Sequence, residues 1–281
     1  MKFVRFGEPG AERPGILDRN GAIRDLSGRV DDLAGAVLAD LSALSGIDPE
    51  SLPVVPGTPR LGPCVGQVGK LLCIGLNYSD HAAETGMEAP AEPILFLKAN
   101  SAICGPNDPI ILPRGSQKTD WEVELAAVIG RGGKYIAEED ALDHVAGYCI
   151  CNDVSERSFQ LERLGQWTKG KSSDNFGPLG PWLVTRDEVA DPQNLKLWCK
   201  VNGETMQDGT TATMIFGVAH LVHYLSQFFT LHPGDVISTG TPPGVGMGKK
   251  PQRFLKAGDV VELGVEGLGT QRQQVIADPA G

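Results

Sequence analysis

The chain has 281 residues, of which 41% are hydrophobic, and a formal net charge of -10 at pH 7. This length and composition suit one large domain with a small appendage. The acidic balance argues against a nucleic-acid groove or an anionic membrane surface as the main partner, because both require clustered Lys and Arg side chains. Charges interrupt the N-terminal segment where a signal peptide would be apolar, and no run of about 18 apolar residues occurs, so a cytoplasmic protein is expected.

The first 60 or so residues have the pattern of a small α+β module. The expected strands are Met1–Phe6, Gly15–Asp18 and Ala22–Asp25. Asn20-Gly21 suits a hairpin turn between the last two, and leucines and valines at helical spacing predict a helix over residues 30–45. Five prolines between Gly46 and Gly69 then break regular structure. We therefore expect an N-terminal module with a Pro-rich linker at residues 1–65 and a catalytic domain at residues 66–281.

From Lys70 onward, short strands separated by Gly and Pro dominate, and helices are expected only near Ser79–Glu84, Ser155–Leu164 and Met214–Phe228. So few helices argue against a doubly wound βαβ fold, and the fold class expected is α+β, mostly β. The strands are expected at Leu71–Ile74, Ile94–Leu97, Ile110–Ile111, Glu122–Ile129, Val145–Cys151, Trp182–Val184, Leu195–Val201, Asp235–Ser238, Asp259–Leu263 and Gln274–Ile276.

The six cysteines form no Cys-x-x-Cys pair. Cys149 and Cys151 would share one face of a strand, but no His or other Cys stands beside them in the sequence. Buried reduced thiols are therefore expected rather than a zinc site or a disulfide.

Two glutamates lie in the core-like strand "TDWEVELAAVIG", residues 119–130. Side chains alternate along a strand, so Glu122 and Glu124 share one face, roughly 7 Å apart, while apolar side chains occupy the other face. Either this face is solvated, or a cation lies between the two charges. Asp153 follows the apolar run 145–151 and would add a third carboxylate from a neighbouring strand end. Such an oxygen-only set suits Mg²⁺, Mn²⁺ or Ca²⁺ rather than zinc.

Two further stretches carry candidate functional side chains. In "LNYSDHAAETG", residues 76–86, His81 and Glu84 would share one helical face, where the carboxylate can orient the imidazole as a water-activating base; an exposed pair with a structural role is the alternative. Lys171 lies in a loop rich in Gly and Pro, where it serves either solubility or ligand binding. The stretch 238–250, "STGTPPGVGMGKK", fits neither a Walker loop nor a dinucleotide fingerprint.

Together these stretches resemble the fumarylacetoacetate hydrolase family over about Leu71 to Leu263. The segment "GQWTKGKSSDNFGPLGPWLVTRDE", residues 165–188, is similar to the branch often labelled ureidoglycolate lyase or 2,4-diketo-3-deoxy-fuconate hydrolase. The resemblance implies a mixed β-sandwich roll, generally a homodimer, with its active site at one end. The residues that match the family's site are the metal ligands Glu122, Glu124 and Asp153, the water-activating dyad His81 and Glu84, the substrate-binding Lys171, the oxyanion-site Gln160 and the threonine Thr241.

The activity that the resemblance implies is metal-dependent hydrolysis of a carbon–carbon bond in a small, anionic β-diketo acid, with Mg²⁺ as the expected cation. A lyase, an oxaloacetate decarboxylase or an isomerase that uses the same metal–enolate chemistry is the alternative. A non-enzymatic protein with a structural cation remains a third possibility, and it predicts that replacing His81 has no effect.

Overall fold

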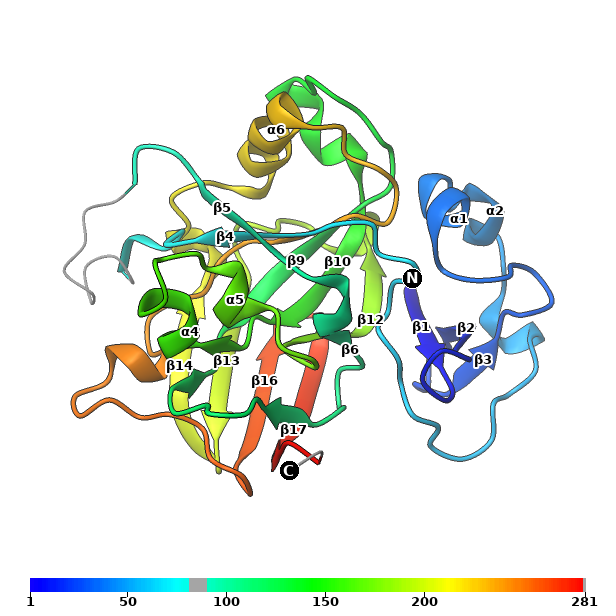
Figure 1. The fold of residues 1–281 in the computed structure, drawn as a ribbon. Coiled ribbons are helices and arrows are strands. Elements are labelled where there is room, and N and C mark those ends of the chain that lie inside the picture. The colour runs from blue at the N-terminus through cyan, green and yellow to red at the C-terminus, as the bar shows by residue number, and fades with distance from the viewer. Residues whose placement is uncertain (81–89, 280–281) are drawn as a thin grey trace.

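The computed structural model describes residues 1–80 and 90–279, and most of its regular structure is β-strand (Figure 1). In this part of the chain, one sheet of ten strands has the order β3-β2-β1-β12-β10-β9-β15-β4-β5, with β6 beside β12. Its strands are β1 (Lys2–Phe6), β2 (Arg13–Leu17), β3 (Ile23–Asp25), β4 (Leu71–Gly75), β5 (Ile94–Lys98), β6 (Ile103–Cys104), β9 (Val123–Ile129), β10 (Val145–Asn152), β12 (Gly177–Thr185) and β15 (Val236–Ser238).

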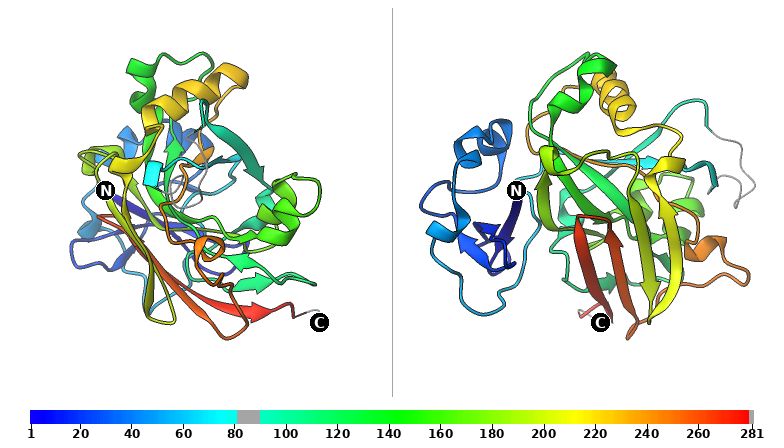
Figure 2. Two further views of the ribbon diagram at one scale, coloured as in Figure 1. Left: turned by 90° about the vertical axis from the view of Figure 1, so that its left-hand side faces the viewer. Right: turned by 180° about the vertical axis from the view of Figure 1, so that it is seen from behind.

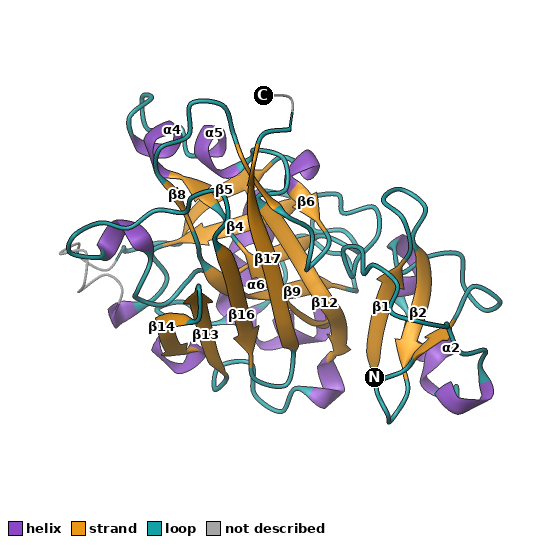
Figure 3. Cartoon of the chain, turned by 90° about the horizontal axis from the view of Figure 1, so that it is seen from below, coloured by secondary structure: helices purple, strands orange, loops and turns teal. Residues whose placement is uncertain are grey.

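A second sheet has the order β14-β13-β16-β17-β7 within the described residues, and its strands lie side by side when the molecule is seen from behind (Figure 2) or from below (Figure 3). These strands are β7 (Ile110–Leu112), β13 (Lys196–Val201), β14 (Glu204–Thr210), β16 (Val260–Val265) and β17 (Gly269–Ala277). A small ladder pairs β8 (Thr119–Asp120) with β11 (Ser155–Glu156). The expectation of a mostly β, mixed-sheet α+β fold is confirmed.

Strand β9 lies between two hydrophobic cores. Leu125, Ala127 and Ile129 pack with β13 and β16 in the core between the two sheets. Ala126 and Val128 face the opposite way, into a core shared with the N-terminal segment. Burial of both faces explains why this strand is apolar almost throughout, since side chains alternate between the two sides. Any polar group on this strand is therefore buried as well.

The N-terminal strands extend the larger sheet, because β1 pairs with β12 through Lys2 opposite Val184 and Phe3 opposite Leu183. The predicted hairpin turn is confirmed: the Asp18 amide donates to the Ala22 carbonyl at 3.0 Å, and Gly21 has φ +80°. That residues 1–65 and 66–281 are separate domains stays a prediction.

The predicted helix over residues 30–45 is wrong in extent. Two short helices occur instead, α1 (Gly35–Ala39) and α2 (Ser42–Ser45), separated by Asp40 in an extended conformation. The Asp40 carboxylate accepts a hydrogen bond from the Ser42 amide at 2.9 Å. Such a local side-chain bond competes with helical hydrogen bonding, and this explains the break.

Two other predicted helices are shorter than expected. The segment that begins at Ser155 starts as strand β11 and becomes helix α4 (Arg157–Leu161) only after Glu156, whose side chain caps the helix by accepting from the Ser158 amide. The helix expected from Met214 begins after Gly217 as α6 (Val218–Phe228). Strand β14 was not predicted, because its sequence ETMQDGT has no alternation of apolar and polar residues. Its extended conformation is stabilised by pairing with β13.

All six cysteines are buried and free, as expected. No helix among residues 1–80 and 90–279 combines the length and hydropathy that crossing a bilayer requires.

Candidate active site

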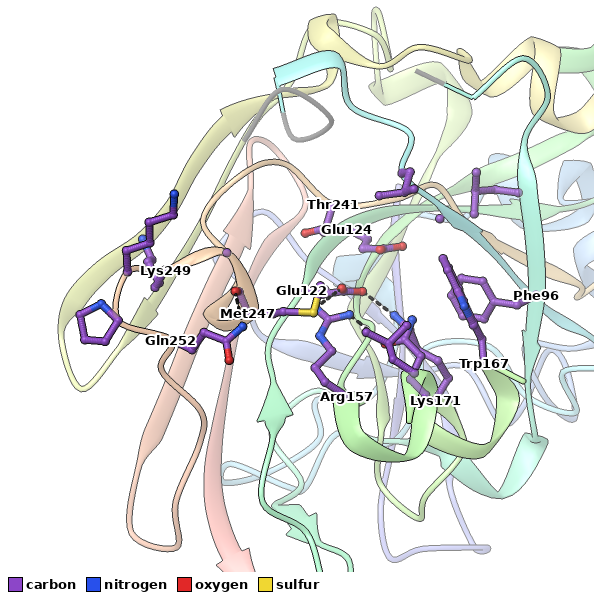
Figure 4. Close-up of a pocket in the computed structure, with 18 residues that line it drawn as sticks. Phe96, Glu122, Glu124, Arg157, Trp167, Lys171, Thr241, Met247, Lys249 and Gln252 are labelled. Atoms are coloured by element: carbon purple, nitrogen blue, oxygen red, sulfur yellow. Dashed lines mark hydrogen bonds and ion pairs between the residues drawn. The ribbon is translucent and has the colours of Figure 1, made fainter. Parts of the chain in front are cut away.

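A cleft of about 680 Å³ opens beside the start of β9, the end of β4 and the middle of β5. Its floor carries Glu122 and Glu124, and α4 and helix α5 (Thr168–Lys171) close one side (Figure 4). A loop over residues 247–252 lines the opposite side. All the site residues expected on described segments lie in this region of the molecule.

Three buried carboxylates converge on the floor. Glu122, Glu124 and Asp153 each offer an oxygen within 4.8 Å of the others. Glu122 directly precedes β9 and shares its face with Glu124, whereas Asp153 directly follows the neighbouring strand β10. The Asp153 amide donates to the Glu122 carbonyl at 3.0 Å, so the sheet itself holds the two side chains together. Strand alternation thus explains the convergence that the sequence predicts.

Buried cations contact two of these carboxylates. The Lys171 ammonium bridges Glu122 Oε2 at 2.6 Å and Asp153 Oδ2 at 2.7 Å. Lys98 Nζ lies 2.5 Å from Asp153 Oδ1, and Arg157 Nη2 lies 2.5 Å from Glu122 Oε1. Figure 4 shows Lys171 and Arg157 reaching Glu122 from the same side of the cleft. Charged groups at such depth require this kind of direct pairing.

Glu124 has a different environment from Glu122. Its hydrogen-bond donors among the described residues are neutral, the Ser238 hydroxyl at 2.5 Å and the Gly240 amide at 3.0 Å, and both reach Oε2. Burial and the nearby charges of Asp153 and Glu122 raise the pKa of Glu124 well above its usual range. Burial also acts to raise the pKa of Glu122, but attraction to Arg157 and Lys171 outweighs it and lowers that pKa to about 2.

This donor set fits a divalent cation. Three carboxylates within reach of one point are hard oxygen ligands, which Mg²⁺, Mn²⁺ and Ca²⁺ prefer. Burial and the charges of Asp153 and Glu122 raise the pKa of Glu124, and none of its hydrogen-bond donors among the described residues carries a positive charge. A cation beside Glu124 would supply that charge.

Lys171 lies in the short helix α5 rather than in the predicted loop. Gly170 brings this helix against α4, because a Cβ at Gly170 would lie 2.4 Å from the Gln160 amide nitrogen and 2.5 Å from the Glu156 carbonyl oxygen. Burial acts to lower the pKa of Lys171, but the charges of Asp153 and Glu122 raise it overall, so the ammonium stays charged.

Gln160 and Thr241 both line the cleft, but their hydrogen bonding differs. Arg157 Nη1 donates to Gln160 Oε1 at 3.1 Å, so the amide of Gln160 keeps its Nε2 donor for a ligand. The Thr241 hydroxyl donates to the Val123 carbonyl at 2.9 Å and accepts from Gln207 at 2.8 Å. It retains only an acceptor lone pair and a methyl group for a ligand.

Two charged residues of the site were missed by the sequence analysis, Lys98 and Asp120. Lys98 ends the apolar strand β5, and a lysine at the end of an apolar strand is the only signal that the sequence offers. Asp120 is fully buried and accepts from Arg157 Nε at 2.9 Å and from the amides of Gly246 at 2.6 Å and Met247 at 3.0 Å. It therefore ties Arg157 to the loop on the far side of the cleft.

His81 and Glu84, the predicted dyad, lie outside the described residues.

A family model, a sequence relative and solved structures all relate this chain to the same protein family. A model described as fumarylacetoacetate (FAA) hydrolase C-terminal matches residues 70–276. A Burkholderia multivorans protein, described as a hydrolase of unproven activity, is 63% identical over 276 residues, which are 97% of this chain and 98% of that protein. The solved structure of a fumarylacetoacetate hydrolase from the psychrophile Exiguobacterium antarcticum has a TM-score of 0.89 at 38% identity, with 99% of each chain covered.

Solved structures with other activities share the fold. The 5-carboxymethyl-2-hydroxymuconate delta-isomerase of Mycobacterium smegmatis has a TM-score of 0.77 at 34% identity, with 99% of each chain covered. The maleylpyruvate hydrolase of Sphingobium sp. SYK-6, solved with manganese(II) and pyruvate, has a TM-score of 0.83 at 27% identity over 99% of this chain and 100% of that one. The family model and these likenesses confirm the resemblance drawn from the motifs: the chain belongs to the fumarylacetoacetate hydrolase family and is an enzyme of the hydrolase or isomerase type.

Proposed function

We propose that this protein is a divalent-metal-dependent hydrolase that cleaves a carbon–carbon bond in a small β-diketo acid, of the acylpyruvate or 2,4-diketo-3-deoxy sugar acid type. The observation that supports the proposal most is the convergence of Glu122, Glu124 and Asp153 on the floor of the cleft, next to Lys171. Mg²⁺ is the proposed cation, with Mn²⁺ or Ca²⁺ as alternatives. When bound, it would act as a Lewis acid that stabilises the enolate charge released by the cleavage.

The chain's own side chains have separate parts in this proposal. Lys171 stays charged on the floor of the cleft and would attract the substrate's carboxylate. His81, oriented by Glu84, would take a proton from water, and the resulting hydroxide would attack the distal carbonyl. Gln160, whose Nε2 is not used by Arg157, would donate to the oxyanion that forms. A donor of this kind is worth about 3 kcal/mol in comparable enzymes.

An isomerase is the main alternative, because the isomerase of Mycobacterium smegmatis shares the fold over 99% of both chains. A lyase such as ureidoglycolate lyase and an oxaloacetate decarboxylase are further alternatives that use the same enolate chemistry. A water-activating dyad at His81 and Glu84 favours hydrolysis, since an isomerase consumes no water.

The proposal also includes a homodimeric assembly, which light scattering on the purified protein tests.

The test is a substrate panel followed by ultraviolet absorbance. Acylpyruvates, oxaloacetate and 2,4-diketo-3-deoxy sugar acids are each incubated with Mg²⁺, with Mn²⁺ and with chelator, and ureidoglycolate is followed separately. Metal-dependent loss of the diketo absorbance, with two carboxylic products, is the expected result. Isomerisation without cleavage, or no reaction on the whole panel while the metal binds, would refute the hydrolase proposal.

A further inference from the structure

We propose that the side of the cleft next to Lys171 is an apolar subsite that selects substrates with an uncharged, apolar acyl substituent, and that Trp167 is its central residue. The inference rests on the proposed function, since it states which part of a β-diketo acid this side receives. We call this side the apolar wall and define it by five residues: Ile74, Leu76, Phe96, Leu161 and Trp167.

The apolar wall comes from four separate segments, the end of β4, strand β5, helix α4 and the residue before α5. Leu161 is 45% exposed, although most large apolar side chains of the protein are buried. Trp167 is half-buried and lies beside Phe96 and Lys171 (Figure 4). Ile74 and Phe96 are buried, so the other three residues of the apolar wall supply the surface that a ligand can reach. Covering this exposed apolar surface with an apolar ligand group gains free energy.

The indole of Trp167 is held in place before any ligand arrives. Its ring centroid lies 5.4 Å from that of Phe96, at an interplanar angle of 60°. Gly75 leaves the space that the indole occupies, because a Cβ at Gly75 would lie 2.4 Å from Cζ3 and 2.9 Å from Cη2 of Trp167. A preorganised ring binds a ligand with little loss of side-chain entropy.

Leu76 provides independent support through its backbone. It has φ +53°, in the left-handed region where Gly or Asn would be less strained than a leucine. The next residue holds this conformation: Asn77 Nδ2 donates to the carbonyls of Phe216 at 2.9 Å and Thr239 at 2.8 Å, and its Oδ1 accepts from the Phe216 amide. Strain kept at a residue that lines the cleft indicates that the apolar side chain is needed there.

The charges around the cleft argue against a carboxylate at the acyl end of the substrate. Lys171 Nζ lies 4.8 Å from the ring centroid of Phe96, and it is already paired with Glu122 and Asp153. Lys249 and Lys250 belong to the loop on the opposite side (Figure 4). The proposed function assigns Lys171 to the substrate's first carboxylate, so a second carboxylate against the apolar wall would lose hydration without a further cation among the described lining residues to pair with it.

The experiment measures kcat/KM for acylpyruvates that differ only in the acyl group: acetyl, hexanoyl and a six-carbon acyl chain that ends in a carboxylate. The native enzyme is expected to prefer the hexanoyl compound over the carboxylate-ended one by about tenfold or more. Trp167→Ala should lower kcat/KM for the hexanoyl compound by about tenfold and for acetylpyruvate by less than about twofold. Leu164→Ala, at a fully exposed leucine off the cleft lining, is the matched control.

A second variant protects the test against misfolding. Leu76→Asn introduces a residue that tolerates the left-handed region and removes the apolar side chain. The same selective loss of kcat/KM for the hexanoyl compound is expected. Preference of the native enzyme for the carboxylate-ended compound would overturn the proposal. Equal losses on all acyl groups in both variants would do so too, because they would indicate that these side chains only support the fold.

A binding measurement separates this inference from the proposed function. If the native enzyme cleaves neither acylpyruvates nor 2,4-diketo-3-deoxy sugar acids, the proposed function fails, but the subsite is still tested by calorimetry on Mg²⁺-loaded protein with pyruvate and with 2-oxo-4-phenylbutanoate. The phenyl compound is expected to bind about tenfold more tightly, and Trp167→Ala should abolish that difference. Equal binding of both acids by the native protein would overturn the apolar subsite.

Discussion

On the floor of the cleft the charges of Glu122 and Asp153 are buried and each is shared by two cations, whereas the apolar wall beside it contains no ionised side chain of its own. Glu122 contacts both Lys171 and Arg157, and Asp153 contacts both Lys171 and Lys98. Removal of one member leaves another as an uncompensated buried charge, so floor substitutions should be costly with every substrate. Apolar contacts do not depend on a charged partner, so each contributes separately. Substitutions in the apolar wall should therefore lower kcat/KM only for substrates that reach it.

The largest effect is expected from Glu124→Gln. This change keeps the shape of the side chain but removes one of three anionic ligands, so affinity for Mn²⁺ should fall by at least about 100-fold and turnover should be lost with every acyl group. Calorimetric titration gives the affinity. Glu139→Gln, at an exposed glutamate, is the control. Unchanged Mn²⁺ affinity would show that Glu124 is not a metal ligand and would contradict the contrast between the floor and the apolar wall.

His81→Ala should come next, with turnover lower by about 100-fold or more, because a positioned general base contributes at least that factor. Metal affinity should stay close to the native value, since His81 is not in the carboxylate set. Both quantities are measured on the same preparation and compared with Glu124→Gln. Equal loss of metal binding in the two variants would contradict this division of roles.

Lys98→Met should destabilise the fold by roughly 3 kcal/mol in the presence of chelator, because the buried Asp153 loses the nearer of its two cationic partners, at 2.5 Å, and keeps only Lys171. Excess Mg²⁺ should recover part of this loss, since a bound cation supplies positive charge beside Asp153 and stabilises the folded state. Urea unfolding with and without Mg²⁺ measures both effects. Lys256→Met, at an exposed lysine, is the control, and equal stability of the two variants would show that the floor charges are not interdependent.

The smallest effect concerns Glu156, which caps α4 beside the floor. Burial acts to raise its pKa, but hydrogen bonds from the Ser116 hydroxyl at 2.5 Å and the Ser158 hydroxyl at 2.6 Å outweigh it and lower that pKa. Its carboxylate therefore stabilises the fold above the unfolded-state pKa of about 4.3, and this contribution is lost as pH falls through the lower folded-state pKa.

Glu156→Gln should flatten the acid side of the stability profile between about pH 5 and pH 3, by less than about 1 kcal/mol, because burial opposes much of the lowering of the pKa that the hydrogen bonds produce. Urea midpoints measured across this range give the profile, with Glu139→Gln again as control. A native profile that is already flat there would show that the cap carries no pH-dependent stability.

The floor could be predicted from the sequence further than the apolar wall. Alternation along one strand places Glu122 and Glu124 on the same face, and Asp153 ends the adjacent apolar run, so local pattern together with the family resemblance predicted the carboxylate set. Helix ends were predicted less well, because side-chain bonds at Asp40 and Glu156 redirected the backbone. The apolar wall has no sequence signature, since each of its residues also reads as an ordinary core residue.

The sequence alone therefore determined the mostly β class, the family and the shared face of Glu122 and Glu124, since these depend on side-chain alternation and on motifs within single segments. Asp153 joins the two glutamates through the pairing of β10 with β9. Only the tertiary structure decided that Lys98 pairs with Asp153, that Asp120 ties Arg157 to the loop at Gly246, and that Gly75 makes room for Trp167. These contacts join residues far apart in the chain. They depend on the order of β9, β15, β4 and β5 in the sheet, which long-range packing selects and no local pattern specifies.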